Sequence, residues 1–574
     1  MYHFDWLEDQ VREFPLLYRK PSPRKKSQPA PTVVHKELSS AKKLTKIRSG
    51  LKDLFMEFCR HSTIHGISHI GSRHRTLFEK FWWVAVFMLS MYGCGKLIDG
   101  MYRKWDENPV IVTFDEKVTP VWAIPFPAVT ICSETKVVRS KVNFTELFLR
   151  FAYGEGVKLN KTELDLLLAT LQLCDEWFFT RPEYDHKYDN YKTSESIVNI
   201  LHQISLTPND TMYHCWENGV PCKLSFTESI TEEGICMTFN GLKSDEMFRT
   251  KFLHSDYEYR LETKSGAHWS LEDGYAAGSD VFSYPFRGMG SGFQAGMYVQ
   301  LMSTKSDLEY HCRESQGFKV LLHSPVDYPQ VSTKFIRVTL GRDIAVAVKP
   351  QIISTEEALH DYEPDRRQCL FNRERQLKFF RVYSQSNCEL ECLTNFTLVS
   401  CGCVPYWMPR SNQTRCCETY ELKCVLTAQK NLMLLNAQTQ IQQQPDNNNS
   451  CDCLPACNSI HYDAEITQSI FNFKETMKLR LGPANISYED IVENKILSKL
   501  EIYFKDVQFI TSKRTEMYGL TDFIASCGGI LGLCMGVSLL SLVELLYFMT
   551  IRPIMLIKNT MRRKVKIVQV ESFQ

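Results

Sequence analysis

The chain has 574 residues, of which 67 are Lys or Arg and 66 are Asp or Glu, so its formal net charge is +1. This balance lacks the positive charge that nucleic-acid binding needs, and we expect no nucleic-acid partner. The motifs HExxH, GxSxG and GxxxxGK[ST] are also missing from the sequence. We therefore expect no enzyme, no catalytic residues and no metal site.

The chain begins with a basic segment, which an apolar stretch follows. Residues 1–76 include the clusters PRKKS and AKKLTKIRS, and residues 81–98 approach the ~20 apolar residues that cross a bilayer. Trp82, Trp83 and Tyr92 lie near the ends of this stretch, where aromatic side chains meet the membrane interface. This placement favours a membrane span over a buried core helix. The first ten residues, MYHFDWLEDQ, lack the apolar core of a signal peptide, so the span itself is expected to direct insertion.

The long middle region combines helical and extended patterns. Apolar residues recur every three or four positions at 144–152 and 161–179, which predicts helices. Alternating patterns at 317–324 and 334–341 predict strands. The Gln/Asn-rich stretch 436–450 is predicted to be a surface loop. Together these patterns indicate a large mixed α/β domain.

Two counts indicate that the middle region is extracellular. Of the 21 cysteines, 17 lie within residues 102–520, which suits an oxidising compartment. The Asn-x-Ser/Thr sequons, which we predict to be N-glycosylated, lie in the same region. They are Asn143, Asn160, Asn209, Asn395, Asn412, Asn448 and Asn485.

Ten of the cysteines crowd into residues 388–457 with CxxxC and CxC spacings. Such spacings also occur in zinc sites, but no histidine lies within the cluster, and the next one is His461. Because extracellular thiols oxidise readily, we interpret the cluster as disulfides. Each disulfide stabilises a fold by roughly 2–4 kcal/mol, so we expect a stiff element here.

A second apolar stretch covers residues 523–549 and contains a single charge, Glu544. Gly528, Gly532 and Gly536 recur every four positions and therefore share one face of a helix. Small residues in this pattern let membrane helices approach closely, so a simple packing surface is one interpretation. A carboxylate inside a membrane usually faces water or a partner, and Glu544 therefore favours a pore.

Basic residues flank both apolar stretches on the side away from the middle region, including RRKVK in the tail. The positive-inside rule then predicts cytosolic termini for a protein of the plasma membrane. The predicted order is a cytosolic segment (1–76), a first membrane helix (77–101), an extracellular domain (102–520), a second membrane helix (521–551) and a cytosolic tail (552–574).

Several motifs, in a fixed order, resemble the degenerin/epithelial sodium channel superfamily and especially its insect pickpocket branch. They are IHGI (64–67), FPAVTIC (126–132), GICMTFN (234–240), NCELEC…CGCVPYWMPR (387–410), CDCLPAC (451–457) and GGILGLCMGVSLLSLVE (528–544). The resemblance runs from residue 64 to about residue 552. It implies a trimeric architecture with two membrane helices per subunit and a large disulfide-rich extracellular domain, as in acid-sensing ion channels.

The resemblance also implies a pairing of the extracellular cysteines. The implied pairs are Cys132–Cys236, Cys215–Cys222, Cys369–Cys457, Cys388–Cys453, Cys392–Cys451, Cys401–Cys424, and Cys403 with Cys416 or Cys417. Cys174 and Cys312 remain as a candidate eighth pair. One thiol of the 416/417 doublet then has no assigned partner.

By resemblance, Gly536, Val537 and Ser538 form the selectivity filter, and Glu544 forms an inner ring that attracts cations. Elementary chemistry agrees with these roles. Glycines and a serine at a constriction expose carbonyl and hydroxyl oxygens that replace the water around a cation. A ring of carboxylates raises the local concentration of cations.

The resemblance assigns three further positions around the pore. Ala525 matches the place where a bulky side chain holds the family's pore open. Gly532, four residues before the filter, matches a contact for amiloride. His65 and Gly66 match a cytosolic gating motif, although a single histidine is more often an ordinary loop residue.

The implied function is an amiloride-sensitive, sodium-selective channel subunit that a sensory stimulus, mechanical or chemical, opens through the extracellular domain. Na⁺ is the permeant ion, and no cofactor is expected. The implied partners are related subunits in a homo- or heterotrimer, membrane lipids and an extracellular stimulus or ligand. The sequence leaves the stimulus open, since protons, peptides, force and constitutive opening all fit it.

Two other classes share this topology. A two-span surface receptor that binds an extracellular ligand without conducting would need neither the glycine stripe nor the intramembrane Glu544. A trimeric ATP-gated channel would need a basic phosphate pocket, and residues 102–520 contain no basic cluster of that kind. Both comparisons favour the sodium channel.

Overall fold

The structure is a computed structural model and describes residues 52–72, 75–107, 109–154, 158–181, 187–189, 191–260, 266–442, 451–481 and 493–558. Two compact units make up the chain. Residues 101–523 form the larger unit, and residues 1–100 with 524–574 form the smaller one. The basic clusters PRKKS, AKKLTKIRS and RRKVK and the sequons at Asn448 and Asn485 lie outside the described residues.

Helices build the smaller unit, and two of them continue into the larger one. They are a helix over 52–61, α2 (Ile67–Ile70), α3 (Leu77–Glu107), α15 (Leu520–Met535), α16 (Leu539–Leu546) and the π-helical turn η11 (Tyr547–Ile551). Within the described residues, Leu77–Glu107 and Leu539–Lys558 are long and apolar enough to cross a membrane. The helix Leu520–Met535 is apolar but shorter.

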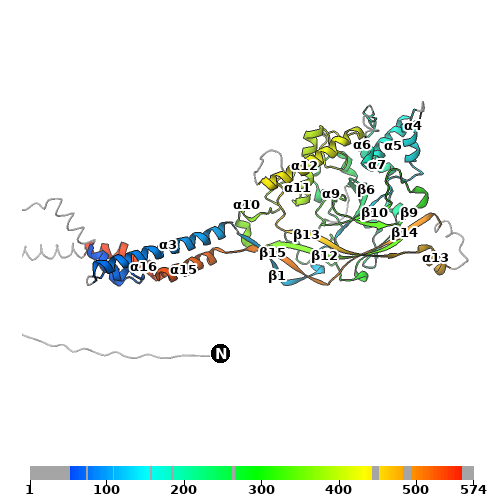
Figure 1. The fold of residues 1–574 in the computed structure, drawn as a ribbon. Helices are drawn as coiled ribbons and strands as arrows, with labels where there is room; N and C mark the ends of the chain where they lie inside the picture. Colours follow the sequence, from blue (N-terminus) through cyan, green and yellow to red (C-terminus); the bar gives the residue numbers. More distant parts are fainter. Residues whose placement is uncertain are drawn as a thin grey trace, which may run out of the picture. The chain divides into compact units, whose positions relative to one another are not determined.

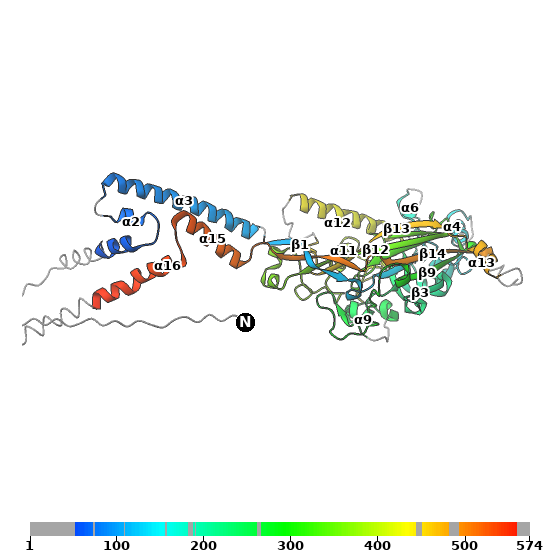
Figure 2. The same cartoon turned by 90° about the horizontal axis from the view of Figure 1, so that it is seen from below.

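The second membrane helix differs from the sequence prediction. A single helix is predicted over 521–551, whereas α15 ends at Met535 and α16 begins at Leu539 (Figure 2). The interruption begins at Gly536, whose φ of 67° lies in the left-handed region that favours glycine. The apolar composition and the single charge of the stretch gave no sign of this turn.

Among the described residues of the larger unit, the strands form three antiparallel or mixed sheets. The first has eight strands in the order β1-β15-β12-β14-β9-β3-β4, with β13 paired to β12. The second has five strands in the order β11-β10-β2-β6-β5, and the third is the pair β7-β8. Among these strands, β12 pairs antiparallel with β13 and parallel with β14 and β15.

The strands have the following bounds: β1 (Val110–Pro120), β2 (Ala128–Ser133), β3 (Met212–Glu217), β4 (Val220–Pro221), β5 (Thr227–Thr231), β6 (Gly234–Phe239), β7 (Trp269–Ser270), β8 (Gly274–Tyr275), β9 (Met297–Thr304), β10 (Gly317–His323), β11 (Ile336–Thr339), β12 (Arg342–Thr355), β13 (Ser459–Ile470), β14 (Lys495–Phe504) and β15 (Gln508–Glu516). The strands predicted at 317–324 and 334–341 correspond to β10 and β11.

Figure 1 shows β6 and β10 between the strands of the large sheet and a group of helices. Within the described residues, the α-helices of the larger unit are α4 (Phe144–Tyr153), α5 (Lys161–Leu171), α6 (Trp177–Thr180), α7 (Ile197–Ile204), α8 (Pro208–Thr211), α9 (Ser244–Met247), α10 (Pro364–Arg367), α11 (Gln385–Cys401), α12 (Leu422–Gln442) and α13 (Phe473–Leu481). Asn143 and Asn160 cap α4 and α5, because each side-chain oxygen accepts a hydrogen bond from the third residue of its helix.

Part of the predicted Gln/Asn-rich loop is helical instead. Residues 436–442 belong to α12, and residues 443–450 lie outside the described residues. Asn, Ala, Gln and Thr are all tolerated in helices, and the first proline of the stretch is Pro445. The polar composition that suggested a loop therefore reflects an exposed helix end.

Two hydrophobic clusters form most of the core. One lies between the two larger sheets and includes Val129, Val320, Val346 and Leu500, all fully buried. The other surrounds the helices and is rich in aromatic side chains such as Phe148. The five-stranded sheet contributes to the first cluster through β2 and β10, which explains why every residue of β10 is buried.

Eight disulfides join cysteines of the described residues. They are Cys132–Cys236, Cys174–Cys312, Cys215–Cys222, Cys369–Cys457, Cys388–Cys453, Cys392–Cys451, Cys401–Cys424 and Cys403–Cys417. Cys403 therefore pairs with Cys417 and not with Cys416. The candidate pair Cys174–Cys312 is also present. Cys416 is a half-buried free thiol, and burial raises its pKa to about 11.

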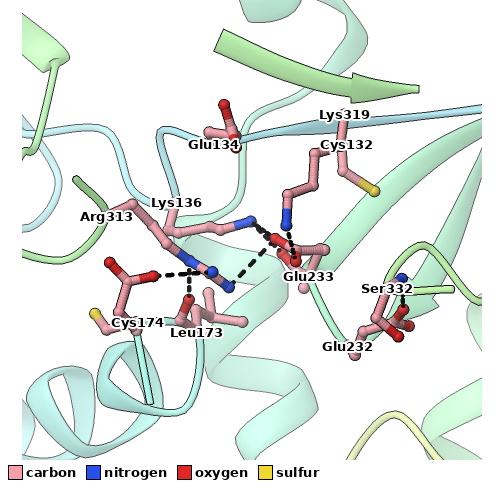
Figure 3. A network of polar contacts seen from close by, with 12 residues as sticks. Cys132, Glu134, Lys136, Leu173, Cys174, Glu232, Glu233, Arg313, Lys319 and Ser332 are labelled. Carbon is pink, nitrogen blue, oxygen red and sulfur yellow. Dashed lines mark hydrogen bonds and ion pairs between the residues drawn. The ribbon is translucent and has the colours of Figure 1, made fainter. Parts of the chain in front are cut away.

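A buried ion-pair network lies beside two of these disulfides (Figure 3). The carboxylate of Glu233, in the turn between β5 and β6, contacts Lys136 Nζ at 2.5 Å and Lys319 Nζ at 2.6 Å. Arg313 contacts the same carboxylate at 3.3 Å and reaches Asp175 at 3.1 Å. The network thus joins the five-stranded sheet to the segment that follows α5.

The charges in this network shift one another's pKa. Burial alone raises the pKa of Glu233, but the positive charges of Lys136, Arg313 and Lys319 outweigh burial and hold the pKa well below its usual range. Burial also lowers the pKa of Lys136, to about 8, although the Glu233 carboxylate opposes this shift. The three cationic side chains therefore favour the ionised form of Glu233.

The membrane helices enter the larger unit through two paired strands. β1 begins three residues after α3 ends, and β15 ends four residues before α15 begins. The two strands are antiparallel, and their register pairs Val110 with Glu516. The rings of Trp105 and Phe523 stack beside this end of the strands with centroids 5.4 Å apart.

Candidate functional site

The segment between α15 and α16 is the candidate functional site. Gly536 closes α15, and its backbone N–H donates to the carbonyl of Gly532 at 2.8 Å. Ser538 is extended and caps α16, because its hydroxyl accepts a hydrogen bond from the backbone N–H of Ser541. The residues predicted as a filter, Gly536 to Ser538, therefore form a short non-helical segment between two apolar helices.

The backbone of this segment carries unused acceptors. Among the described residues, no donor contacts the carbonyl oxygen of Gly536 or of Val537. A carbonyl oxygen without a donor can replace water around a cation, as the carbonyls of selectivity filters do. The helix break therefore has the chemistry that the sequence analysis assigned to a filter.

The segment before α2 packs directly against the helix break. The backbone N–H of His65 donates to the carbonyl of Met535 at 2.9 Å. The imidazole of His65 lies so close to Gly536 that a Cβ there would sit 2.6 Å from its Cε1. His65 and Gly536, predicted separately as a gating residue and a filter residue, are neighbours in the structure.

A second contact joins Thr63 to α16. The hydroxyl of Thr63 lies 2.7 Å from that of Ser541, which is buried. The backbone N–H and the hydroxyl of Thr63 both donate to Glu544 Oε2, at 3.3 Å and 3.2 Å. Glu544 thus binds the N-terminal segment of its own chain, a contact that the predicted role of a cation ring did not include.

Further contacts tie the same segments together. The hydroxyl of Ser90 on α3 donates to the carbonyl of Cys534 at 2.8 Å, two residues before the break begins at Gly536. Arg552 forms an ion pair with Glu57 at 2.5 Å, and the rings of Phe58 and Phe548 meet edge to face at 5.5 Å. The break is therefore positioned by α3 and by residues 57–65.

One face of α15 is open in the single chain. A Cβ added at Gly528 or Gly529 would meet no described atom within 4 Å, and one at Gly532 would meet only the carbonyl of Val537 at 3.8 Å. Ala525 lies on the same helix and is exposed. Within the small-residue stripe, Gly528 and Gly532 therefore have no close neighbour from another segment among the described residues, whereas Gly536 packs against His65.

Sequence reasoning missed three residues of this site. Thr63, Ser541 and Ser90 supply side-chain contacts around the break. Ser541 lies inside the motif at 528–544 but was given no role, and Thr63 and Ser90 belong to no motif singled out in the sequence. Thr63 and Ser541 are 478 positions apart, so no local pattern joins them. The available signal was the position of Thr63, two residues before His65.

The predicted glycosylation sites are spread over the larger unit. Asn160, Asn209, Asn395 and Asn412 are exposed, and Asn143 is half-buried. The amide nitrogen of Asn143 also donates to Glu146 at 3.1 Å. Four of the five described sequons are thus accessible to a glycan.

The described geometry combines apolar helices of membrane-spanning length, a broken helix with free carbonyl oxygens and a disulfide-rich domain. The family model described as "Amiloride-sensitive sodium channel" matches residues 58–548. The chain belongs to this family, which confirms the resemblance seen in the motifs. The family is membrane-embedded, its members form oligomers of subunits, and they are ion channels rather than enzymes.

Curated relatives agree with this assignment. Pickpocket protein 28 of Drosophila melanogaster is 29% identical over 521 residues, which cover 88% of this chain and 80% of the relative. Acid-sensing ion channel 1C of Danio rerio is 23% identical and covers 85% and 82%. Sodium channel protein Nach of Drosophila melanogaster is 21% identical and covers 89% of each chain.

Proposed function

We propose that this protein is a subunit of an amiloride-sensitive, sodium-selective cation channel in the plasma membrane, with both termini in the cytosol. A mechanical or chemical stimulus acting on the extracellular domain opens it. The observation that carries the proposal is the helix break at Gly536–Ser538, where two backbone carbonyls accept no hydrogen bond from the described residues. The family of the chain and the names of its relatives support the choice of Na⁺.

A single copy of this segment cannot enclose a pore, so the proposal requires several subunits, and we propose a homo- or heterotrimer. Support comes from the open face of α15, where Gly528 and Gly529 have no described neighbour within 4 Å of an added Cβ. Membrane helices commonly use such small-residue faces to pack against other helices. In the trimer this face meets the neighbouring subunits or borders the pore.

The test avoids the unknown stimulus. Ala525→Val adds bulk to an exposed position of α15, three residues before the glycine stripe, and is expected to hold the pore open. In oocytes we expect a constitutive current that external amiloride blocks. When K⁺ replaces external Na⁺, the reversal potential of this current should shift to more negative values, as a sodium-selective channel requires. Ala123→Val, at a position in the larger unit, is the matched control and is expected to give no constitutive current.

The proposal has two defined ways to fail. A constitutive current that follows the K⁺ gradient contradicts sodium selectivity. No current from either variant, despite surface delivery and co-expression with related subunits, favours a two-span receptor that does not conduct.

A further inference from the structure

The π-helical turn η11 follows α16 directly and covers Tyr547–Ile551. The backbone N–H of Arg552 donates to the carbonyl of Tyr547, five residues earlier, whereas an α-helix would use the carbonyl four residues earlier. Such turns are rare and occur frequently at functional sites. The chain returns to the α-helical form over residues 552–558.

Pro553 gives this turn a cause in the sequence. A proline inside an α-helix has no N–H to donate, and its ring clashes with the carbonyl four residues earlier, which here belongs to Met549. A wider turn just before the proline separates the ring from that carbonyl. Because the π-helical turn ends at Ile551, two residues before Pro553, we attribute the turn to the proline.

The turn decides which side chain faces the N-terminal segment. A π-helical turn holds about one residue more than an α-helical turn, so it rotates the residues after it by about 100° relative to α16. In an uninterrupted α-helix, Ile551 would therefore stand about where Arg552 stands. Arg552 is half-buried in the structure, whereas Ile551 is exposed.

Arg552 uses this position to bind Glu57. Its Nη2 donates to Glu57 Oε1 at 2.5 Å, and the two side chains are 36% and 34% exposed. Four residues earlier, the ring of Phe548 meets the ring of Phe58 edge to face. Two consecutive residues of the N-terminal segment thus bind the helix on both sides of the π-helical turn.

The chain from Cys59 to Gly71 forms a closed loop next to this contact. Cys59 is fully buried, and its Cβ leaves no room for a Cβ at Gly71. The middle of the loop carries Thr63 and His65, which contact α16 and the end of α15. Glu57 and Phe58 lie immediately before the loop, so they fix the point from which it starts.

We propose that Glu57 and Arg552 are positioning residues of the channel. Their ion pair holds the base of the loop, and through it the contacts of Thr63 and His65 at the helix break. The π-helical turn before Pro553 is what brings Arg552 to Glu57. The inference rests on the proposed function, because the pair acts through the loop on the segment that we propose to be the filter.

A charge exchange in oocytes tests the pair in the Ala525→Val background. Arg552→Glu and Glu57→Arg each place like charges side by side, and we expect each to lower the Na⁺/K⁺ permeability ratio by about threefold at equal surface delivery. The double variant restores opposite charges and should restore the ratio. Lys558→Glu reverses an exposed positive charge near the end of the same helix and is the matched control, with an unchanged ratio expected.

A second pair of variants tests the role of the turn. Pro553→Ala lets the helix continue in the α-helical form, which rotates Arg552 away from Glu57 and should lower the permeability ratio as Arg552→Glu does. In that form Ile551 takes the place of Arg552. Ile551→Arg combined with Pro553→Ala should therefore restore the ratio.

Hydrogen–deuterium exchange separates this inference from ion conduction. In the purified full chain in lipid nanodiscs, we expect the backbone amides of residues 57–65 to exchange about threefold faster in Arg552→Glu and in Glu57→Arg. The charge exchange should return them to the original rate. If Ala525→Val carries no current, the proposed function fails, and the exchange rates alone decide whether the pair holds the loop.

Two results would overturn the inference. The first is a double variant that stays as impaired as Arg552→Glu, in the permeability ratio or in the exchange rates. The second is a Pro553→Ala chain with unchanged exchange in residues 57–65, which would mean that the π-helical turn does not bring Arg552 to Glu57.

Discussion

The surroundings of Glu233 and of Gly536 are held in place in different ways. Glu233 is buried and contacts three cationic side chains from three separate segments, with the disulfides Cys132–Cys236 and Cys174–Cys312 beside it. Among the described residues, Gly536 is held by the backbone hydrogen bond from His65 to its neighbour Met535 and by the Thr63 contacts further along. Several ion pairs and disulfides hold the surroundings of Glu233, whereas a few hydrogen bonds hold those of Gly536.

This difference separates a rigid part from a part that can change its conformation. A carboxylate with three partners keeps its position when one contact breaks, because the other two remain. A hydrogen bond to the protein contributes only about 1 kcal/mol on balance, so the Thr63 contacts can break and reform easily. The helix break therefore depends on fewer and individually weaker contacts than the surroundings of Glu233.

The largest expected effect tests the weakly held region. Gly536→Ala puts a Cβ at 2.6–2.8 Å from three ring atoms of His65 and forces a non-glycine residue into the left-handed region. The left-handed backbone alone costs roughly 1–2 kcal/mol. In the Ala525→Val background we expect loss of nearly all the Na⁺ current while surface delivery persists.

Two variants sharpen this result. Gly95→Ala, where an added Cβ meets nothing within 4 Å, is the matched control and should keep its current. His65→Ala combined with Gly536→Ala removes the colliding ring and should restore part of the current. Equal currents from Ala525→Val channels with and without Gly536→Ala would show that the left-handed turn is unimportant.

The next effect tests the strongly held region. Glu233→Leu leaves Lys136, Lys319 and Arg313 close together without their shared anion. Breaking a buried ion pair in this way destabilises a protein by about 3–5 kcal/mol. We expect a clear fall in the melting temperature of the purified protein, and a much smaller one for Glu228→Leu, because Glu228 is half-buried and has one partner.

A pH titration examines the same carboxylate with a smaller change. Because the pKa of Glu233 is lowered in the folded chain, its stabilising effect is complete above the ordinary value of 4.5 and is lost as the pH falls below it. The slope reaches at most about 1.4 kcal/mol per pH unit. Glu233→Gln should be less stable at pH 6 and should show a flatter decline between pH 5 and pH 3. Parallel curves for the two proteins would mean that Glu233 has an ordinary pKa.

The smallest effect concerns the contact between Thr63 and α16. Thr63→Val removes the hydroxyl that contacts Ser541 and Glu544 but keeps the size of the side chain. We expect a change of about 1 kcal/mol, seen as a severalfold drop in the Na⁺/K⁺ permeability ratio in the Ala525→Val background. Thr63→Ser keeps the hydroxyl and should retain the ratio. If both variants behave alike, the hydrogen bond is not what positions the filter.

The resemblance of ordered motifs to a known family predicted the cysteine pairs of the larger unit, and apolar patterns predicted some of its helices and strands. The 416/417 doublet was the exception, because adjacent cysteines satisfy a pairing pattern equally well, and only the structure distinguishes Cys417. The strand β10 was predicted from its alternating pattern, although the structure buries all of its residues, Lys319 and His323 included.

The candidate site was predictable only in part. Gly536, Ser538 and His65 stand out by residue type and motif, but their proximity depends on folding residues 62–66 against the end of α15. The interruption of the second helix was missed because apolar composition is the same in one long helix and in two short ones. The decisive feature is the φ of one glycine, which hydropathy does not report.

The pairing of β1 with β15 has a mechanical consequence for the two membrane helices. Val110 and Glu516, the first rung of this ladder, lie within four residues of the ends of α3 and α15. A force that separates the end of α3 from the start of α15 acts on one end of this strand pair. The inter-strand hydrogen bonds then break one after another, so the resistance to separation is low. A force that moves both helix ends in the same direction breaks no hydrogen bond between β1 and β15. The joint is therefore compliant to separation of the two helices and stiff to their common displacement.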